Sequence, residues 1–481
     1  MENTIIKRRS VFLIVFLFLS TAIYGKALSK PVLVPVVDGP WWQVADNPMD
    51  HKYATEKQQP VDFAVWQAAD GTWQLWSCIR HTKAGGEGGR TRFFYGWEGK
   101  NLTDSNWKPE GIKMEADPSL GETPGGLQAP HVIKVGDTYH MFYGDWVNIC
   151  QATSKDGKNF QRVIQPNGKT GMFSEGPGSI TRDPMLIQID GLWYCYYTAL
   201  PGGKGYGFCR TSPDLEKWSY SCVVSYGGKV GSDRFQNECP HVVEVEPGVF
   251  YYFRNQFYGK NARNWVYRSD NPLNFGIDDD SKLVRSWHLA APELIRYEGQ
   301  YYIAALKDTL DGIKIARLKW IKLPELGKSV FDFDSTAGRN AWTLKSGNLA
   351  SIFTNSKRSN FKSRTEYFIG TAEIGKGKFD DKRAGVIESP VFTLEQDSYI
   401  LFVSGGDDRQ NVYVALIEAG TEKQIARLTG KNDNTFEKIP VDCSGAKGKR
   451  VFIRIVDKTT VPWGHINFGG MYEDPLAPYN D

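Results

Sequence analysis

Net charge is the first thing that this sequence lacks. The chain has 481 residues, with 58 lysines and arginines against 55 aspartates and glutamates, so its formal net charge is only +3. Proteins that bind polyanions usually carry a clear basic excess, gathered on one face. We therefore expect no nucleic-acid partner.

Cysteine and histidine are also scarce. The seven cysteines are odd in number and form no close CxxC pair, and no two of the seven histidines have HxxxH spacing. This pattern argues against a disulfide framework and against a zinc site, although one or two bridges stay open in an exported protein. We predict no cofactor and no catalytic metal, and we leave open a calcium ion in a central channel.

Long apolar runs are absent apart from VFLIVFLFL at residues 11–19. Lys7, Arg8 and Arg9 precede this run and small residues follow it, which is typical of a signal peptide. The run is too short to span a membrane. We predict a signal peptide over residues 1–25, cleaved near Gly25, and a secreted or periplasmic protein without a membrane span.

Aromatic residues and glycine are abundant: 15 Trp, 23 Tyr, 26 Phe and 49 Gly. They recur in five similar segments, each with an apolar stretch, a turn centred on glycine, and an aromatic stretch. The segments are VDFAVWQAADGTWQLWSC at 61, QAPHVIKVGDTYHMFYG at 128, RDPMLIQIDGLWYCYYT at 182, ECPHVVEVEPGVFYYFRN at 238 and AAPELIRYEGQYYIAAL at 290. A period near 50 residues indicates repeated supersecondary units.

Each repeat predicts a β-hairpin followed by further strands, without a helical pattern between repeats. The simplest architecture is an all-β, five-bladed β-propeller over residues 35–322, in which the first strand of each blade lines a central channel. After KWIKLPELGKS the pattern changes to alternating stretches such as YILFVSGG and VFIRIVD. We predict a C-terminal β-sandwich over residues 330–475.

Acidic residues stand at the start of three repeats, namely Asp62, Asp183 and Glu238. One such acid is more often a turn or cap residue, but repeat symmetry would bring all three to the mouth of the channel. Carboxyl groups held close together tend to include one protonated acid and one ionised base or nucleophile, as glycosidic bond cleavage requires. Arg182 could keep a carboxylate ionised or bind sugar hydroxyls.

The motifs around these acids resemble those of the five-bladed propeller glycosidases, glycoside hydrolase families 32 and 43. RDP at 182–184 and ECP at 238–240 look most like family 32, as does the C-terminal sandwich. The resemblance implies Asp62 as nucleophile, Asp183 with Arg182 as transition-state stabiliser, Glu238 as acid/base, and a retaining enzyme that releases terminal β-fructosides.

Two alternatives stay open. QPVDFAVWQ around Asp62 lacks the WMNDPNG pattern usual in family 32, which leaves an inverting, family 43-like arabinofuranosidase or xylosidase with Asp62 as general base. A non-catalytic glycan-binding propeller is the other alternative. In each case the partner is an oligosaccharide or polysaccharide.

Further candidates for sugar binding come from the same repeats. The set is Gln128, Trp66, His131, His241 and Trp287. Histidines in such places are more often structural, and tryptophans are at least as often core residues. In the sandwich, Trp463 and His465 are candidates for glycan binding, against a simple role in packing.

Overall fold

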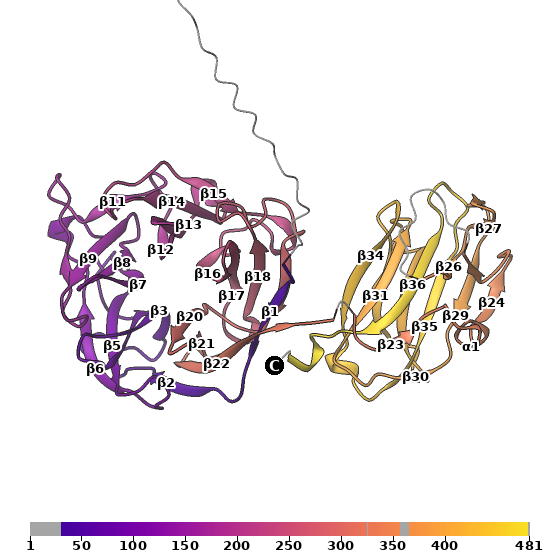
Figure 1. The fold of residues 1–481 in the computed structure, drawn as a ribbon, viewed down its shortest axis with the longest axis horizontal. Coiled ribbons are helices and arrows are strands. Elements are labelled where there is room, and N and C mark those ends of the chain that lie inside the picture. The colour runs from indigo at the N-terminus through magenta and orange to yellow at the C-terminus, as the bar shows by residue number, and fades with distance from the viewer. Residues whose placement is uncertain (1–29, 325, 356–364, 480–481) are drawn as a thin grey trace, which may run out of the picture.

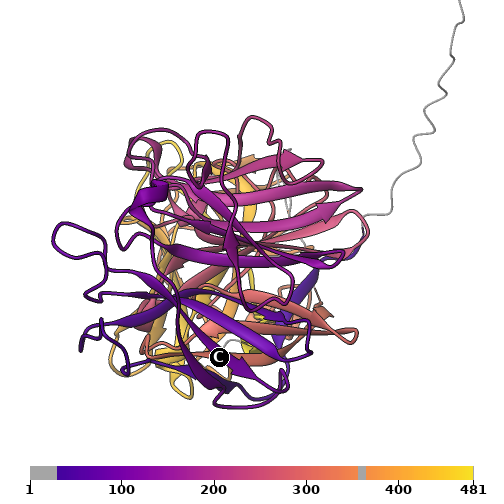
Figure 2. The ribbon, with the colours of Figure 1, turned by 90° about the vertical axis from the view of Figure 1, so that its left-hand side faces the viewer.

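The computed structural model describes residues 30–324, 326–355 and 365–479. They form a propeller and a sandwich that lie side by side along the long axis of the molecule (Figures 1 and 2). This arrangement confirms the predicted all-β fold. The predicted signal peptide, residues 1–25, lies outside the described residues. No helix in the described part of the chain has the length and apolar character needed to cross a membrane.

Four of the five blades are antiparallel sheets built from consecutive strands. The first contains β3 (Gln59–Gln67), β4 (Trp73–Arg80), β5 (Phe93–Gly99) and β6 (Lys108–Met114). The second contains β7 (Gln128–Val135), β8 (Thr138–Gly144), β9 (Ile149–Ser154), β10 (Gln161–Arg162) and β11 (Gly171–Phe173). The third contains β12 (Arg182–Ile189), β13 (Leu192–Ala199), β14 (Tyr206–Ser212) and β15 (Cys222–Ser225). The fourth contains β16 (Glu238–Glu246), β17 (Val249–Phe257), β18 (Arg263–Ser269) and β19 (Leu283–Trp287).

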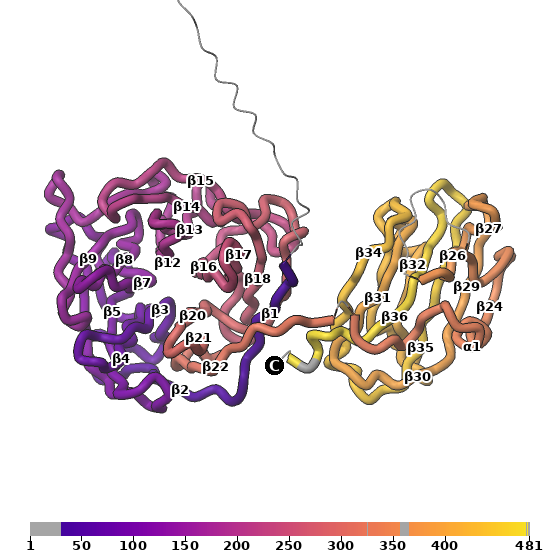
Figure 3. The backbone as a smooth tube through the Cα atoms, in the orientation of Figure 1, coloured from indigo at the N-terminus to yellow at the C-terminus, as the bar shows by residue number. Residues whose placement is uncertain are grey.

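The fifth blade joins the two ends of the propeller. It contains β20 (Glu293–Tyr297), β21 (Gln300–Leu306) and β22 (Gly312–Lys322), completed by β1 (Leu33–Val37) and β2 (Trp42–Asp46) from the start of the chain. Leu33 pairs with Lys322 in this closure. The tube in Figure 3 shows β1 beside this last blade. Contacts between inner strands run β3, β7, β12, β16, β20 and back to β3, so the ring is closed around one axis.

Aromatic side chains fill the space between and within the blades. The largest fully buried ones include Trp76, Trp97, Tyr143, Tyr196 and Tyr252. Each buries a large apolar area, and their ring contacts are mostly edge-on, the geometry that aromatic pairs prefer. Most of the aromatic richness of the sequence therefore serves packing.

The sandwich packs two six-stranded sheets against each other. One contains β23 (Ser329–Phe331), β25 (Phe353–Thr354), β26 (Phe368–Gly370), β31 (Ser398–Gly405), β34 (Asp433–Asp442) and β36 (Ile466–Glu473). The other contains β24 (Thr343–Gly347), β29 (Gly385–Glu388), β30 (Phe392–Thr393), β32 (Val412–Glu418), β33 (Gln424–Leu428) and β35 (Arg450–Asp457). A hairpin, β27 (Glu373–Gly375) and β28 (Lys378–Phe379), and one short helix, α1 (Thr336–Asn340), complete this part.

Candidate functional site

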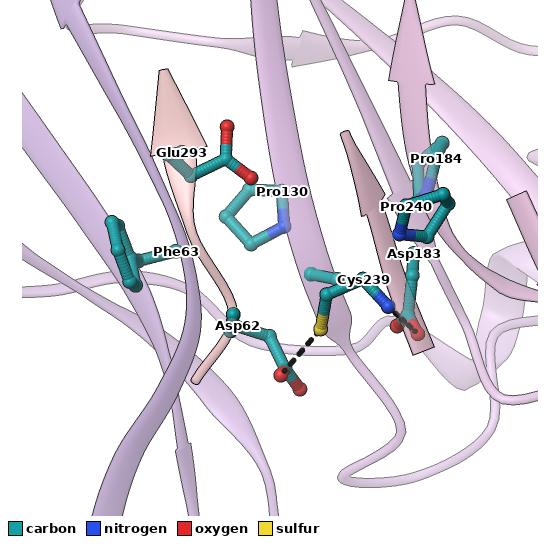
Figure 4. Close-up of a pocket in the computed structure, with 10 residues that line it drawn as sticks. Asp62, Phe63, Pro130, Asp183, Pro184, Cys239, Pro240 and Glu293 are labelled. Atoms are coloured by element: carbon teal, nitrogen blue, oxygen red, sulfur yellow. Dashed lines mark hydrogen bonds between the residues drawn. The ribbon is translucent and has the colours of Figure 1, made fainter. Parts of the chain in front are cut away.

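The starts of the five inner strands meet in a pocket on the propeller axis (Figure 4). All five blades contribute to its wall. The lining residues are Asp62, Phe63, Ala129, Pro130, Asp183, Pro184, Cys239, Pro240, Ala291 and Glu293. The enclosed volume is about 10 Å³. This is the narrow base of the channel, with room for roughly one water molecule, so a sugar ring would lie above it.

One lining residue in each blade has the same unusual backbone. The φ angles are 41° at Asp62, 43° at Ala129, 57° at Asp183, 44° at Cys239 and 48° at Ala291. In the first four blades the pairing register shifts at this position, which marks a β-bulge. A bulge redirects a side chain out of the regular pleat. Here the four bulge positions, with Ala291 at the matching place in the fifth blade, supply the polar and small groups of the axial pocket.

This register corrects one sequence-based expectation. Asp62 and Asp183 do occupy equivalent bulge positions, but Glu238 is one residue earlier and is equivalent to Arg182 and Gln128. Cys239 takes the bulge position in the fourth blade. The proline repeat could not reveal the difference, because the acid and its neighbour are both close to the proline in sequence.

Arg182 connects two of the predicted catalytic acids. Its guanidinium forms an ion pair with Glu238, and its Nε atom lies 3.6 Å from Oδ2 of Asp183. All three side chains are more than nine-tenths buried. Burial opposes the charge on Arg182, but the carboxylates of Glu238 and Asp183 more than compensate and raise its pKa. Arg182 therefore stays a cation that holds both acids near one point.

Asp183 has the most perturbed acidity in the pocket. Burial raises its pKa to about 7, against the opposing effect of Arg182, and the charges of Asp62 and Glu238 raise it further. Oδ2 accepts the backbone N–H of Cys239 at 3.1 Å. Oδ1 has no hydrogen-bond partner among the residues that the structure describes. A buried, protonated carboxyl with a free oxygen is suited to binding a hydroxyl-rich ligand.

Cys239 lies between Asp183 and Asp62, a bridging role that the sequence did not suggest. Its sulfur lies 3.4 Å from Oδ1 of Asp62 and 3.3 Å from the hydroxyl of Tyr258. Burial and the nearby carboxylates raise its pKa well above the ordinary value, so the thiol keeps its proton and can donate it to Asp62. Nη1 of Arg92 lies 3.5 Å from the other oxygen of Asp62.

His131 and His241 both face Glu293, an acid that sequence reasoning missed. Nδ1 of His241 lies 3.2 Å from Oε2 of Glu293, and Nδ1 of His131 lies 4.0 Å from it. The N–H of Leu294 donates to Nε2 of His241, which places the proton of a neutral ring on Nδ1. Burial lowers the pKa of His131 to about 4. Both rings are therefore adjacent to the pocket without forming its wall.

The other predicted sugar-binding residues separate into two groups. Gln128 is buried at the position equivalent to Arg182, and its Oε1 atom has no partner in the described part of the chain. Trp66 and Trp287 instead pack in hydrophobic cores and donate to Gly157 and Asn264. Neither tryptophan lines the axial pocket. The outward direction of an aromatic side chain could not be inferred from its place in the repeat.

Trp146 is an aromatic residue of the second blade with an exceptional backbone. Its φ of 81° is a left-handed value that a bulky residue rarely adopts. Buried Asp145 fixes the turn by accepting the N–H groups of Val147 and Asn148 at 2.8 and 2.6 Å. The indole lies below Arg90 and Arg92, whose guanidinium carbons are 4.2 and 5.3 Å from ring centroids. Through Arg92 it is connected to Asp62.

The sandwich candidates Trp463 and His465 form one stacked pair, with ring centroids 5.5 Å apart. Nδ1 of His465 lies 2.7 Å from Asp381, and Nε2 lies 3.1 Å from Asn434. Trp463 keeps 39% of its surface exposed. The pair is therefore held in place with one aromatic face near solvent.

No group of three or more His, Cys, Asp or Glu side chains in the described ranges is arranged to hold a metal ion. All seven cysteines lie in those ranges and are free thiols.

Comparison with known proteins gives limited similarity. No family model matches the chain. A stretch of 87 residues is 33% identical to ecdE of Aspergillus rugulosus, whose name describes a proposed glycosyl hydrolase. This match spans 18% of the chain and only 12% of that relative.

Several solved structures are similar to this chain at low sequence identity. A thermostable family-43 glycoside hydrolase is 15% identical, with 56% of this chain and 91% of that chain covered and a TM-score of 0.42. An endo-arabinase from Bacteroides thetaiotaomicron is 14% identical, with coverage of 56% and 95% and a TM-score of 0.42. A family 43 arabinoxylan arabinofuranohydrolase from Bacillus subtilis, in complex with cellotetraose, is 13% identical, with coverage of 90% and 99% and a TM-score of 0.39. These TM-scores are below 0.5, so the fold assignment rests on the strand pairing of this chain.

Proposed function

We propose that this protein is an exported glycoside hydrolase that cleaves a terminal sugar at the axial pocket. The observation that supports the proposal is a pair of buried acids on Arg182, Asp183 and Glu238, beside a pocket that Asp62 and Asp183 line together. Hydrolysis of a glycosidic bond needs a proton donor for the leaving oxygen and an opposed carboxylate. A purely structural cluster would have no need of two buried carboxyl groups beside one cation.

Each residue then has a chemical role. Glu238 protonates the leaving oxygen, and Asp62 acts on the opposite face of the sugar, either on a water molecule or on the anomeric carbon. Arg182 binds ring hydroxyls, and the carboxyl group of Asp183 stabilises positive charge at the anomeric centre when it is ionised. Cys239 and Arg92 hold Asp62 in position through contacts at 3.4 and 3.5 Å.

One acid of the same cluster also holds a proton. Near neutral pH the cluster keeps a proton on Asp183, whose pKa is raised to about 7, while Arg182 is paired with Glu238. A sugar hydroxyl that takes over an N–H group of Arg182 weakens this ion pair. The carboxyl group of Glu238 is then free to contact the leaving oxygen.

The substrate that we propose is a terminal α-L-arabinofuranoside or β-xyloside, cleaved with inversion. The segment QPVDFAVWQ favours it over a β-fructoside, because the residues that flank Asp62 lack the Asn and the Pro-Asn-Gly usual in fructoside enzymes. In this mechanism Asp62 is the general base for water. The retaining β-fructosidase interpretation stays as the second candidate, supported by RDP and ECP at 182 and 238.

A panel of chromogenic glycosides, with arabinan, xylan and fructans, tests the activity. Asp62→Asn and Glu238→Gln should each lower turnover by about 10²–10⁴-fold, the usual contribution of an acid or base. Glu244→Gln, at the other end of β16, is the matched control and should keep full activity. Full turnover in either active-site variant would contradict the assignment. Failure of the parent protein to cleave any sugar would favour a glycan-binding propeller instead.

The anomer that appears first during hydrolysis, followed by NMR, decides between the two mechanisms. Inversion supports Asp62 as a base, and retention supports Asp62 as a nucleophile and returns the fructoside to first place. Export is a separate proposal that rests on residues 1–25. N-terminal sequencing of the protein recovered outside the cytoplasm should find a start near residue 26.

A further inference from the structure

A second concave site lies beside the axial pocket and has the opposite charge. It is a groove of about 400 Å³ on the fourth blade. Its lining residues are Phe257, Lys260, Asn261, Ala262, Arg263 and His288. None of them lines the axial pocket. The groove therefore has room for a sugar ring, which the base of the axial pocket does not.

Two short segments place the groove next to the axial pocket. One connects β17 to β18 (Figure 1) and contains Tyr258. The hydroxyl of Tyr258 lies 3.3 Å from the sulfur of Cys239. The other leads from β19 to β20 and carries His288 only three residues before Ala291. A glycan with its terminal sugar above Asp62 would thus have its neighbouring unit or side branch within reach of the groove.

The charges of the groove are available to a ligand. Lys260, Arg263 and His288 are all exposed. Among the described residues, His288 pairs with Asp308 at 3.0 Å, whereas neither Lys260 nor Arg263 forms an ion pair. The guanidinium of Arg263 lies 5.9 Å from the ring centroid of Trp265, which limits its movement. Two cations without a protein counterion, in a concave site, favour an anionic ligand.

An apolar surface accompanies these charges. Phe257 keeps 43% of its surface exposed at the wall of the groove. Aromatic side chains stack on the apolar faces of sugar rings, and lysine or arginine binds a carboxylate by charge-assisted hydrogen bonds. The combination fits an acidic sugar better than a free inorganic anion, which would make no use of Phe257.

We propose that this groove binds a uronic acid unit of the glycan, with Lys260 and Arg263 on its carboxylate and Phe257 on its ring. The inference rests on the proposed function, because it makes the substrate an acidic glycan and not a neutral one. Asp62 and Glu238 repel such a charge at the cleavage point, so the cationic groove also orients the chain: the neutral terminal sugar enters the axial pocket, and the charged unit stays beside it.

Calorimetric titration can test the site without turnover by use of the Glu238→Gln variant. The probes are a xylo-oligosaccharide with one glucuronic acid branch and the unbranched oligosaccharide of the same length. We expect the branched probe to bind about tenfold more tightly at low salt, from two partly exposed charge contacts. The preference should fall towards parity at about 0.5 M salt, where the Debye length is only a few ångströms.

Two double variants localise the effect. Lys260→Ala with Arg263→Ala should abolish the preference for the branched probe, whereas Lys229→Ala with Arg234→Ala, an exposed pair in another loop, should preserve it. Equal affinity for the two probes, no binding of the branched probe at millimolar concentration, or a preference that survives the first double variant would each overturn the inference. If free sulfate competes with the branched probe for binding as strongly as free glucuronate does, the inference is likewise overturned in favour of a simple anion site.

The two proposals fail in distinguishable ways. If the protein hydrolyses neutral and branched substrates at equal rates and shows no binding preference, the glycosidase proposal holds and the acidic-glycan site is contradicted. If the binding preference depends on Lys260 and Arg263 but the protein hydrolyses no sugar, the glycosidase proposal is contradicted and the acidic-glycan site holds.

Discussion

Asp62 and Asp183 occupy the same bulge position in the first and third blades, with φ angles of 41° and 57°. Because the ring is closed, this shared position directs both side chains to one axial pocket although they are far apart in sequence. Aspartate tolerates left-handed φ better than most residues, so the two acids suit the bulge as well as the chemistry.

Stability of the propeller should depend on pH through Asp183. Its pKa in the folded protein is raised from 3.8 to about 7, so the protonated form favours folding. The contribution is fully present below about pH 4 and is lost as the pH rises towards 7. Asp183→Asn, which stays neutral, should therefore gain stability relative to the parent protein between pH 4 and 8. The effect would be excluded if the melting temperatures of Asp183→Asn and the parent protein differed by the same amount at every pH from 4 to 8.

Replacement of Cys239 should affect turnover more than substrate binding. Cys239→Ala removes the thiol contact to Asp62, and we expect kcat to fall about tenfold, as for loss of one hydrogen bond to a charged group. Cys239→Ser restores a donor and should recover most of the activity, with KM and melting temperature close to those of the parent protein. Equal kcat for the alanine and serine variants would show that the sulfur does not position Asp62.

The sandwich has its own buried acid, Asp457. Burial raises its pKa to about 7, and Oδ2 has no partner among the residues described. As for Asp183, the contribution of the protonated form is therefore fully present below about pH 4 and is lost as the pH rises towards 7. Asp457→Asn should raise the melting temperature at pH 8 more than at pH 5 and leave hydrolysis unchanged. A loss of hydrolysis would indicate that the sandwich contributes to the active site.

The strain of a left-handed backbone can be measured at an alanine. Ala291 has a φ of 48°, and its N–H donates to Asn255 at 3.0 Å, whereas Ala304 lies in the regular strand β21. Ala291→Gly relieves about 1 kcal/mol of left-handed strain, which offsets the entropy that glycine loses on folding. Ala304→Gly has no such relief and should lower the free energy of unfolding by about 1 kcal/mol. Urea titrations measure the free energy of unfolding of both variants. An equal decrease in the two variants would argue against stored strain at Ala291.

The repeat was sufficient to predict the five blades because each blade contains the same pattern of apolar stretch, glycine turn and aromatic stretch. It also led to Arg182 and to three acids near one axis. The repeat did not predict the exact strand register. A bulge adds one residue without changing the composition, so Glu238 and Cys239 could not be assigned to their separate positions from sequence.

Residues that contribute from outside the repeat motif were missed for a related reason. Arg92 lies between the repeat segments, and Glu293 follows its proline instead of preceding it. Trp66 and Trp287 were placed near sugars because tryptophan serves both in cores and in binding sites, and only burial distinguishes these roles.

The pairing of β1 with β22 sets the order in which the propeller can fold. Leu33 cannot meet Lys322 until the whole intervening chain is available, so a growing or translocating chain has four complete blades before the fifth can form. Contacts so distant in sequence make folding slow and leave the edge of β22 unpaired until the last step. Closure is then all-or-none, and the axial pocket, which draws on all five blades, exists only in molecules whose two ends have met.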